Sequence, residues 1–449
     1  VQYGVKYTLT LSNWQESSKQ TGKDFLEWSG TTKIKIAAGT LTDNSSNTSK
    51  EATFELGHVD FIKPEIVKVS STVDKTAKTE TIIFNLYDKY LFKDTYIDKY
   101  FIYANNVSVY IDGESATGIT KTFTKVSDIA VTGKGVIGQQ YKLVLSNFEQ
   151  STIASGKHYK DYSGTVSIEI AAGTVKDTSG NTNDKVTITG DLVDFIAPAV
   201  IYRNTDLEKD SVYKSVSMIF EVTDKYYSSE NKDLQLSDLT IKIDNKIIDN
   251  SSNVTRNLRV VNLKDTIDGS ERIIGKCYWL TLSGLEQLQI KEGDKYLDYS
   301  GVITVAIPAS KAKDDSSNQN TATTITTGID LPESTGTAEV VDVVAPHIEA
   351  TSLTVDAKAK TGTVTIQATD KYFASSTLST SIDVYVNGTK STSVGKTITS
   401  KNLTETRAEN GTTSTVQYGQ EVTLTLTNIP SDSTIKQVKL LIPEGAVID

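Results

Sequence analysis

The stretch TVSIEIAAGTVKDTSGNTN, residues 165–183, contains the two patterns that decide the fold. Residues 165–170 alternate between polar and apolar side chains, which is typical of a strand with one buried face. A run of small residues and the sequence DTSGN (177–181) follow. Asp, Ser, Gly and Asn form turns because their side chains bond the local backbone or because they tolerate left-handed conformations. The stretch therefore predicts a strand that ends in a tight turn.

This combination of strand and turn belongs to a repeat with a period of about 138 residues. It returns as AAGTLTDNSSNTS (37–49) and as IPASKAKDDSSNQN (307–320), and VQYGVKYTLTLSN (1–13) returns as VQYGQEVTLTLTN (416–428). We expect a piece of a longer array of modules. The expected divisions are the C-terminal half of a module at 1–60, complete modules at 61–195 and 196–343, and a module lacking its last strand at 344–449.

Within one period the pattern is β throughout. The module at 61–195 contains seven short runs rich in Val, Ile, Thr and Tyr, bounded by turn-forming residues, and no convincing helical stretch. Closely spaced antiparallel strands of this number predict an all-β fold of tandem immunoglobulin-like β-sandwich domains, arranged as an extended rod. The Cys and Trp residues of antibody domains are missing, which excludes the antibody class itself. The seven runs are residues 65–71, 81–88, 106–113, 119–131, 141–147, 165–173 and 185–194.

The composition argues against several classes of function. A formal net charge of −10 argues against nucleic-acid partners and anionic membrane surfaces. The single cysteine, Cys277, excludes an intrachain disulfide framework. No apolar run approaches the roughly 20 residues of a spanning helix, so we expect no membrane insertion within this segment. Nucleophile elbows, zinc-protease helices and phosphate-binding glycine loops are also missing, and the sequence therefore predicts that the protein is not an enzyme.

The repeated phrases resemble a known family. A small-residue strand that ends in Asp-x-Ser-Gly-Asn, followed by a strand that ends in Val-Asp-x-x-Ala-Pro as at 193–198, is similar to the tandem bacterial Ig-like (Big-type) repeats of large cell-surface adhesins and fibre proteins. The resemblance covers the whole chain. It implies an extracellular, cell-attached stalk or fibre with calcium at its domain junctions. The period is longer than the family's, and Ser46 and Ser317 replace the glycine in two of the three turns.

Strand parity predicts where the acidic residues of a module gather. Consecutive strands of a seven-strand sandwich mostly alternate in direction, so the loop after strand two, the turn after strand six and the entering linker lie at one pole. Ca²⁺ takes six to eight oxygen ligands, and a cation would neutralise carboxylates that otherwise repel one another. The expected ligands are Asp60, Asp88, Asp177 and Asn181 at the first junction, Asp194, Asp224, Asp314 and Asn318 at the second, and Asp342 and Asp370 with Asp449 at the third.

Other interpretations of these residues stay open. Asp, Ser and Asn are ordinary turn formers, and an Asp before an Ala-Pro linker can simply cap or solvate it. Lys89, Lys225 and Lys371 directly follow the loop aspartates and could neutralise them without a metal. A repeated aromatic before Ser-Gly, at Trp28, Tyr162 and Tyr299, fits a packing corner better than a sugar-stacking surface.

Together these patterns predict a non-enzymatic structural or adhesive repeat region of a secreted bacterial cell-surface protein, such as a stalk, fibre or surface-layer component. Its expected partners are neighbouring copies or flanking repeats of the same protein, and a host-surface protein or glycan. One alternative is a set of carbohydrate-binding or spacer modules of a larger secreted glycan-active enzyme. A second alternative is a phage fibre module.

Overall fold

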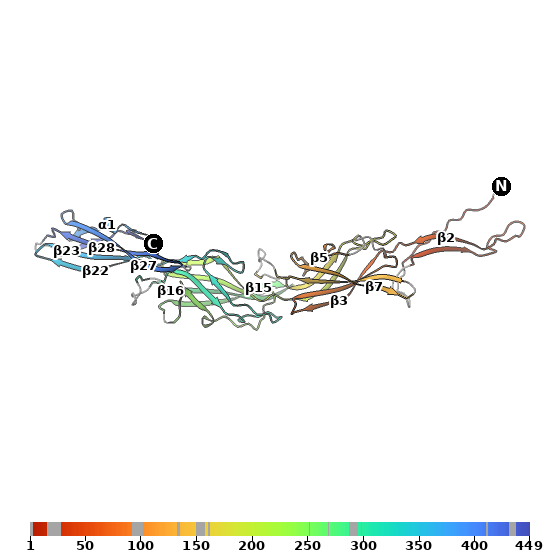
Figure 1. Cartoon of the computed structure of the whole chain (residues 1–449), viewed down its shortest axis with the longest axis horizontal. Helices are drawn as coiled ribbons and strands as arrows, with labels where there is room; N and C mark the ends of the chain where they lie inside the picture. The colour runs from red at the N-terminus through yellow and green to blue at the C-terminus, as the bar shows by residue number, and fades with distance from the viewer. Residues whose placement is uncertain are drawn as a thin grey trace. The chain divides into compact units, whose positions relative to one another are not determined.

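The computed structural model describes residues 3–15, 28–91, 102–132, 135–149, 158–159, 162–250, 252–267, 269–286, 295–297, 299–409, 412–430 and 437–449. Antiparallel strands make up nearly all of the regular structure, which confirms the predicted all-β class (Figure 1). The one α-helix among these residues, α1 (Leu378–Ser381), is a single turn. Over the same ranges, no helix is long and apolar enough to cross a membrane.

The chain divides into two compact units, and each is described by itself. The first comprises Val1–Ile153 and Lys160–Ile196, and the second comprises Ala154–Tyr159 and Ala197–Asp449. The first unit begins with a two-stranded antiparallel sheet of β1 (Gly30–Ile36) and β2 (Ala52–Val59). The linker that follows β2 carries Asp60.

The rest of the first unit contains two four-stranded sheets, with strand orders β3-β4-β8-β7 and β10-β9-β5-β6. Strand β4 alternates half-buried and buried residues over its whole length, as expected for a strand with one face toward a core. The strands are β3 (Glu65–Asp74), β4 (Thr79–Tyr87), β5 (Val107–Ile111), β6 (Glu114–Ser115), β7 (Thr120–Val131), β8 (Gly135–Ser146), β9 (Gly164–Ile170) and β10 (Val186–Val193).

The inward faces of these two sheets share one hydrophobic core. Phe84 of β4 and Tyr141 of β8 stack with their ring centroids 5.7 Å apart, and both side chains are almost inaccessible to solvent. Val166 and Ile168 of β9 belong to the same cluster from the opposite sheet. This core has the composition that the alternating runs of the sequence predict, since Phe, Tyr, Val and Ile bury large apolar surfaces between pleated sheets.

The second unit contains two further sets of antiparallel sheets, each packed around its own core. Its first part has a sheet of order β11-β12-β16-β15 and a sheet that runs β14-β13-β17-β18-β19-β20, with β21 paired to β17. Both sheets contribute to one core, which contains Phe220 of β12 and Val305 of β17. The strands are β11 (Ala199–Asp210), β12 (Ser215–Thr223), β13 (Thr240–Ile243), β14 (Lys246–Ile247), β15 (Thr255–Ile267), β16 (Ser270–Ser283), β17 (Gly301–Ile307), β18 (Thr323–Thr326), β19 (Ile329–Asp330), β20 (Thr335–Gly336) and β21 (Val340–Val341).

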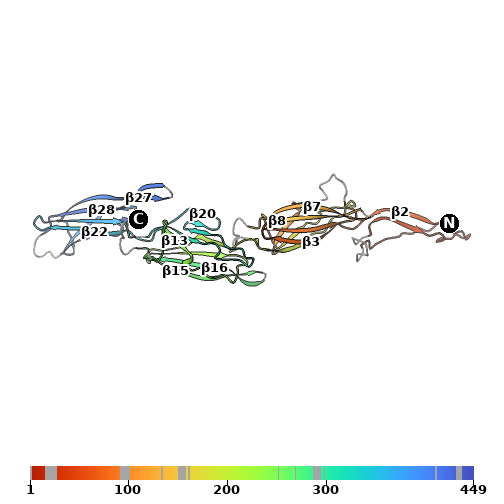
Figure 2. The same ribbon diagram turned by 60° about the horizontal axis from the view of Figure 1, so that its bottom comes forward.

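The last part of the second unit has a sheet of order β22-β23-β28-β27, in which β22, β28 and β27 are labelled in Figure 2. A three-stranded sheet, β26-β25-β29, and the pair β24-β30 complete it, and its core contains Val384, Val422 and Leu424. The strands are β22 (His347–Asp356), β23 (Thr361–Thr369), β24 (Ser375–Ser376), β25 (Asp383–Val386), β26 (Thr389–Lys390), β27 (Gly395–Glu409), β28 (Thr412–Thr427), β29 (Val438–Leu441) and β30 (Val447–Ile448).

Candidate metal centre

Asp60 lies in the linker after β2 and is held by neutral hydrogen-bond donors. Its Oδ1 accepts hydrogen bonds from Ser29 Oγ at 3.0 Å and from the Ile62 N–H at 3.2 Å. Its Oδ2 accepts a hydrogen bond from Ser179 Oγ at 2.9 Å. These bonds fix the direction of the carboxylate, because both of its oxygens are engaged.

Asp88 follows the last residue of β4 directly. Its N–H donates to the Ile137 carbonyl at 3.0 Å and so continues the ladder between β4 and β8. Its Oδ1 accepts the Tyr90 N–H at 2.7 Å, which forms a tight turn of the kind that Asp favours. The side chain is therefore placed at the exact end of a buried strand.

Asp177 shapes the turn between β9 and β10. Its Oδ1 accepts the N–H groups of Ser179 and Asn181, each at 2.8 Å, and its Oδ2 accepts a hydrogen bond from Asn181 Nδ2 at 2.7 Å. The Asn181 amide also donates to the main-chain oxygen of Asp60 at 3.3 Å. The turn is thus bonded both to itself and to the linker.

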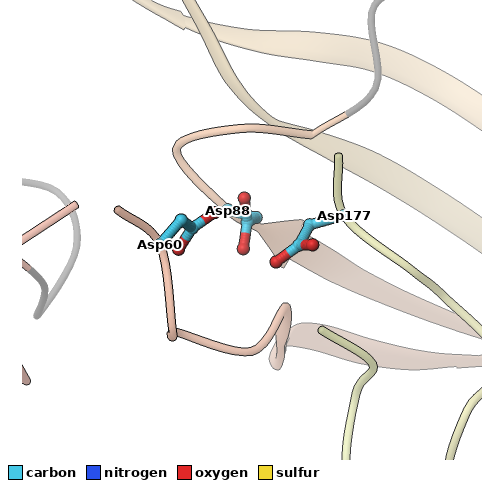
Figure 3. Close-up of side chains that lie close together, drawn as sticks. All are labelled: Asp60, Asp88 and Asp177. Atoms are coloured by element: carbon cyan, nitrogen blue, oxygen red, sulfur yellow. The ribbon is translucent and has the colours of Figure 1, made fainter. Parts of the chain in front are cut away.

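These three aspartates converge. One carboxylate oxygen from each lies within 4.8 Å of the others, and Figure 3 shows the side chains pointing toward one another. Asp60, Asp88 and Asp177 are only 8%, 3% and 1% exposed. Two like charges at this separation repel by about 3 kcal/mol at an effective dielectric constant of about 20. Among the described residues, every hydrogen bond to the carboxylates of Asp60 and Asp177 comes from an uncharged group.

The same constellation occurs within the second unit, where oxygens of Asp342, Asp370 and Asp449 lie within 4.8 Å of one another. Asp342 Oδ1 accepts hydrogen bonds from Ser300 Oγ at 2.6 Å and from the Val344 N–H at 3.2 Å, in the pattern of Asp60. The two triads are therefore built alike from equivalent parts of the repeat.

Asp370 takes the place of Asp88 in this second triad. It follows β23 directly, its N–H donates to the Tyr418 carbonyl at 2.9 Å, and its Oδ1 accepts the Tyr372 N–H at 2.7 Å. Asp370 is 2% exposed, whereas Asp449 is exposed.

The remaining predicted residues are divided between the two units. Asp194 belongs to the first unit, where it is 5% exposed and accepts a hydrogen bond from Ser163 Oγ at 2.9 Å. Asp224 and Asp314 belong to the second unit, are each 1% exposed, and have carboxylate oxygens within 4.8 Å of each other. Asp194 accepts a serine hydroxyl as the other linker aspartates do. Asp224 accepts the Tyr226 N–H at 2.7 Å, as Asp88 accepts the Tyr90 N–H.

Asn181 and Asn318 act as donors in the structure. Asn318 Nδ2 donates to Asp314 Oδ2 at 2.6 Å, just as Asn181 donates to Asp177. The amide nitrogens therefore organise the turn, while the expectation that their amide oxygens bind a cation stays a prediction.

A comparison of two turns shows what burial does to these carboxylates. Asp43 forms an equivalent turn at an exposed place, and hydrogen bonds from the Asn47 side chain and from the Asn47 and Ser45 amides lower its pKa. Asp314 makes similar bonds, but burial outweighs them and raises its pKa. Burial of the turn thus disfavours the ionised form of its aspartate, and a bound cation would favour that form again.

The lysines that follow the loop aspartates contact the Ser-Gly segments. Lys89 Nζ donates to the main-chain oxygen of Ser29, and Lys371 Nζ donates in the same way to Ser300. Lys371 also pairs with Asp244, which lies outside the triad. These contacts tie the loop after β4 or β23 to the segment that holds the linker aspartate.

Sequence reasoning missed the serines. Ser29, Ser163 and Ser300 each donate a hydroxyl hydrogen bond to the linker aspartate of the same repeat. The sequence signal for these serines is the Ser-Gly pair that recurs at the start of β1, β9 and β17.

The aromatic residues before Ser-Gly differ in exposure. Tyr299 is 5% exposed, and the Tyr162 hydroxyl accepts the Thr117 N–H at 3.1 Å, so these two side chains have packing and loop-pinning contacts. Trp28 is 54% exposed.

Comparison of the sequence with protein-family models finds no match, and comparison with curated proteins finds none either.

Proposed function

We propose that this chain is a structural, non-enzymatic repeat region made of immunoglobulin-like β-sandwiches, and that the joints between its modules bind calcium. The observation that carries the proposal is the recurrence of the aspartate triad. Asp60, Asp88 and Asp177 in the first unit correspond one to one with Asp342, Asp370 and Asp449 in the second. Turn chemistry alone explains each aspartate singly but does not explain why three gather twice in the same way.

The chemistry of the triad suits a hard cation. Ca²⁺ prefers carboxylate, carbonyl and water oxygens, and Asp60, Asp88 and Asp177 supply carboxylate oxygens in a site that shields them from solvent. When bound, the ion would neutralise the mutual repulsion of these carboxylates. The protein itself contributes the fixed orientation of each ligand, through the serine hydroxyl at the linker and the amide donors of the turn.

A cation at this place would stiffen the chain because its ligands come from different segments. Asp60 belongs to the linker, whereas Asp88 lies in the loop after β4 and Asp177 in the turn between β9 and β10. A cation bound to all three segments would restrict the conformations of the linker, and it would do so without any new apolar contact.

Extracellular calcium is abundant enough for a weak site of this kind, since extracellular modules bind with dissociation constants of about 10⁻⁴ to 10⁻³ M. We therefore place the protein outside the cell, as part of a surface stalk, fibre or layer. Neighbouring copies or flanking repeats of the same protein are its proposed partners, because each unit of a repeat protein contacts its neighbours.

The direct test is calcium titration of the whole chain by isothermal titration calorimetry. Asp88→Asn keeps the size of the side chain, removes one buried charge, and should abolish binding to the triad of the first unit. Asp184→Asn is the control, because Asp184 is an exposed carboxylate of the same unit whose ion pair with Lys63 lies on the surface. Titration without heat from the unaltered chain, or equal binding by Asp88→Asn, would contradict the proposal.

A further inference from the structure

A second set of contacts in the second unit joins the loop before β17 to the long hairpin of β27 and β28, and it contains no member of the triads. Lys295 and Tyr296 lie in this loop. The Tyr296 hydroxyl bonds Glu405 Oε1 at 3.3 Å, and Lys295 Nζ lies 3.5 Å from Glu405 Oε2. One carboxylate of β27 therefore receives two side chains from the loop.

Arg407 also binds the Glu405 carboxylate. Its Nη2 and Nε donate to Glu405 Oε1 at 2.7 and 3.2 Å, and Nη2 also donates to the main-chain oxygen of Lys371 at 2.8 Å. The side chains of Arg407 and Glu405 are only 13% and 14% exposed. Ion pairs shielded to this degree are screened less by salt than surface pairs.

Aromatic rings surround the two cations. The Arg407 guanidinium lies 5.9 Å from the Tyr296 ring centroid and 5.6 Å from that of Tyr372, and Lys295 Nζ lies 5.1 Å from the Tyr418 ring centroid. An aromatic ring attracts a cation that lies over its face, and the attraction is stronger where the cation is shielded from water. Charge, hydrogen bonds and ring contacts thus all act between the same two segments.

We propose that Lys295 and Tyr296 with Glu405 and Arg407 form a lock that needs no metal and fixes the part of the second unit with β11–β21 to the part with β22–β30. The lock acts in addition to the Asp342 triad. Its chemistry does not depend on a bound cation, so it holds this joint when calcium is removed.

An apolar counterpart elsewhere in the second unit supports the lock as a recurring device. Tyr159, which precedes Ser163 as Tyr296 precedes Ser300, packs with Leu263 against the cluster of Tyr226, Ile267 and Ile274. Both contacts therefore use a tyrosine that comes before the Ser-Gly segment, but one meets apolar residues and the other meets charged ones.

The experiment measures the spread of distances across the joint in excess chelator, so its outcome does not depend on the proposed calcium sites. Spin labels on cysteines at Val212 and Lys358, two exposed turn positions, report this distance by pulsed electron resonance. Cys277 is buried, and burial raises the pKa of its thiol to about 11, so it reacts slowly with the label.

The unaltered chain should give one narrow distance peak in chelator, and Arg407→Met should lose it. Tyr296→Ala tests the lock from the loop side and should also lose the narrow peak. It provides the test if Arg407→Met fails to fold. Lys401→Met removes an exposed cation from the same strand and should keep the peak. A broad distribution in the unaltered chain, or a narrow peak in every folded variant, would overturn the proposal.

Discussion

Glu80 shows at the scale of one residue how this fold tolerates a buried charge at a cost. It lies near the start of β4 with 0% exposure, and its Oε1 accepts the Asp191 N–H at 2.6 Å. Gly190 leaves room for it, since a Cβ there would lie 2.1 Å from Glu80 Oε1. Burial raises the pKa of Glu80 to about 7, although the Asp191 amide and the charge of Lys68 act in the opposite direction.

This raised pKa predicts a pH dependence of stability. Below pH 4.5 the carboxyl is protonated in the folded and unfolded states alike, so it has no effect. As the pH rises from 4.5 to about 7, the unfolded chain is ionised while the folded carboxyl stays protonated. The free energy of unfolding of the first unit therefore falls across this range, by about 3 kcal/mol in total at about 1.4 kcal/mol per pKa unit, and stays at the lower value above it. Glu80→Gln should remove this loss.

Hydrogen exchange of the β4 and β10 amides, corrected for the intrinsic exchange rate at each pH, measures the effect. Protection at pH 8 should be greater in Glu80→Gln than in the unaltered chain, whereas Glu114→Gln, at an exposed position, should change nothing. Equal protection of the two chains at pH 8 would show that Glu80 is not desolvated in the folded state.

At the scale of elements, the start of strand β17 depends on a glycine. Gly301 has φ +152°, and a Cβ there would lie 2.4 Å from Asp244 Cγ. Asp244 in turn accepts the Val302 N–H at 2.8 Å and pairs with Lys371. A side chain at position 301 would push this carboxylate away from both partners.

Gly301→Ala should therefore destabilise the second unit by about 2–4 kcal/mol, as strain and lost polar contacts combine. Gly388→Ala is the matched control: Gly388 has φ +83° but nothing within 4 Å of a Cβ, so only backbone strain of about 1–2 kcal/mol is expected. Urea unfolding of both variants compares them. If Gly301→Ala costs no more than Gly388→Ala, the close approach of Asp244 does not matter.

The strands could be predicted from the sequence because alternation along runs such as 165–170 survives in the burial of β9. Strand parity similarly indicated that segments distant in sequence, those of Asp60, Asp88 and Asp177, would meet at one end of a module. Both predictions rest on patterns that repeat.

The lock could not be predicted, because only its tyrosine repeats, at Tyr159 and Tyr296, whereas the charged residues of the hairpin do not. The register of the β27–β28 hairpin matches that of the β15–β16 hairpin. In this alignment Glu405 corresponds to Asp265, and Arg407 corresponds to Ile267. A contact that changes from apolar to charged between modules leaves no common sequence signal, and only the packing of the two segments shows it.

At the scale of the whole molecule, the proposed calcium binding would link stability to calcium concentration. A ligand that binds the folded chain and not the unfolded one stabilises it by about 2.7 kcal/mol per site at a hundredfold excess over the dissociation constant. The net charge of −10 adds general repulsion, so magnesium at the same ionic strength must be compared with calcium to separate screening from binding.

The measurement that tests the central claim most directly is the thermal unfolding of the unaltered chain in calcium and in excess chelator. The carboxylate triads predict a melting temperature that rises steadily with calcium concentration and falls back when chelator is added. Asp88→Asn should show a smaller rise than Asp184→Asn. Superimposable melting curves in calcium and in chelator would contradict calcium binding at the triads and leave turn formation as the explanation of these aspartates.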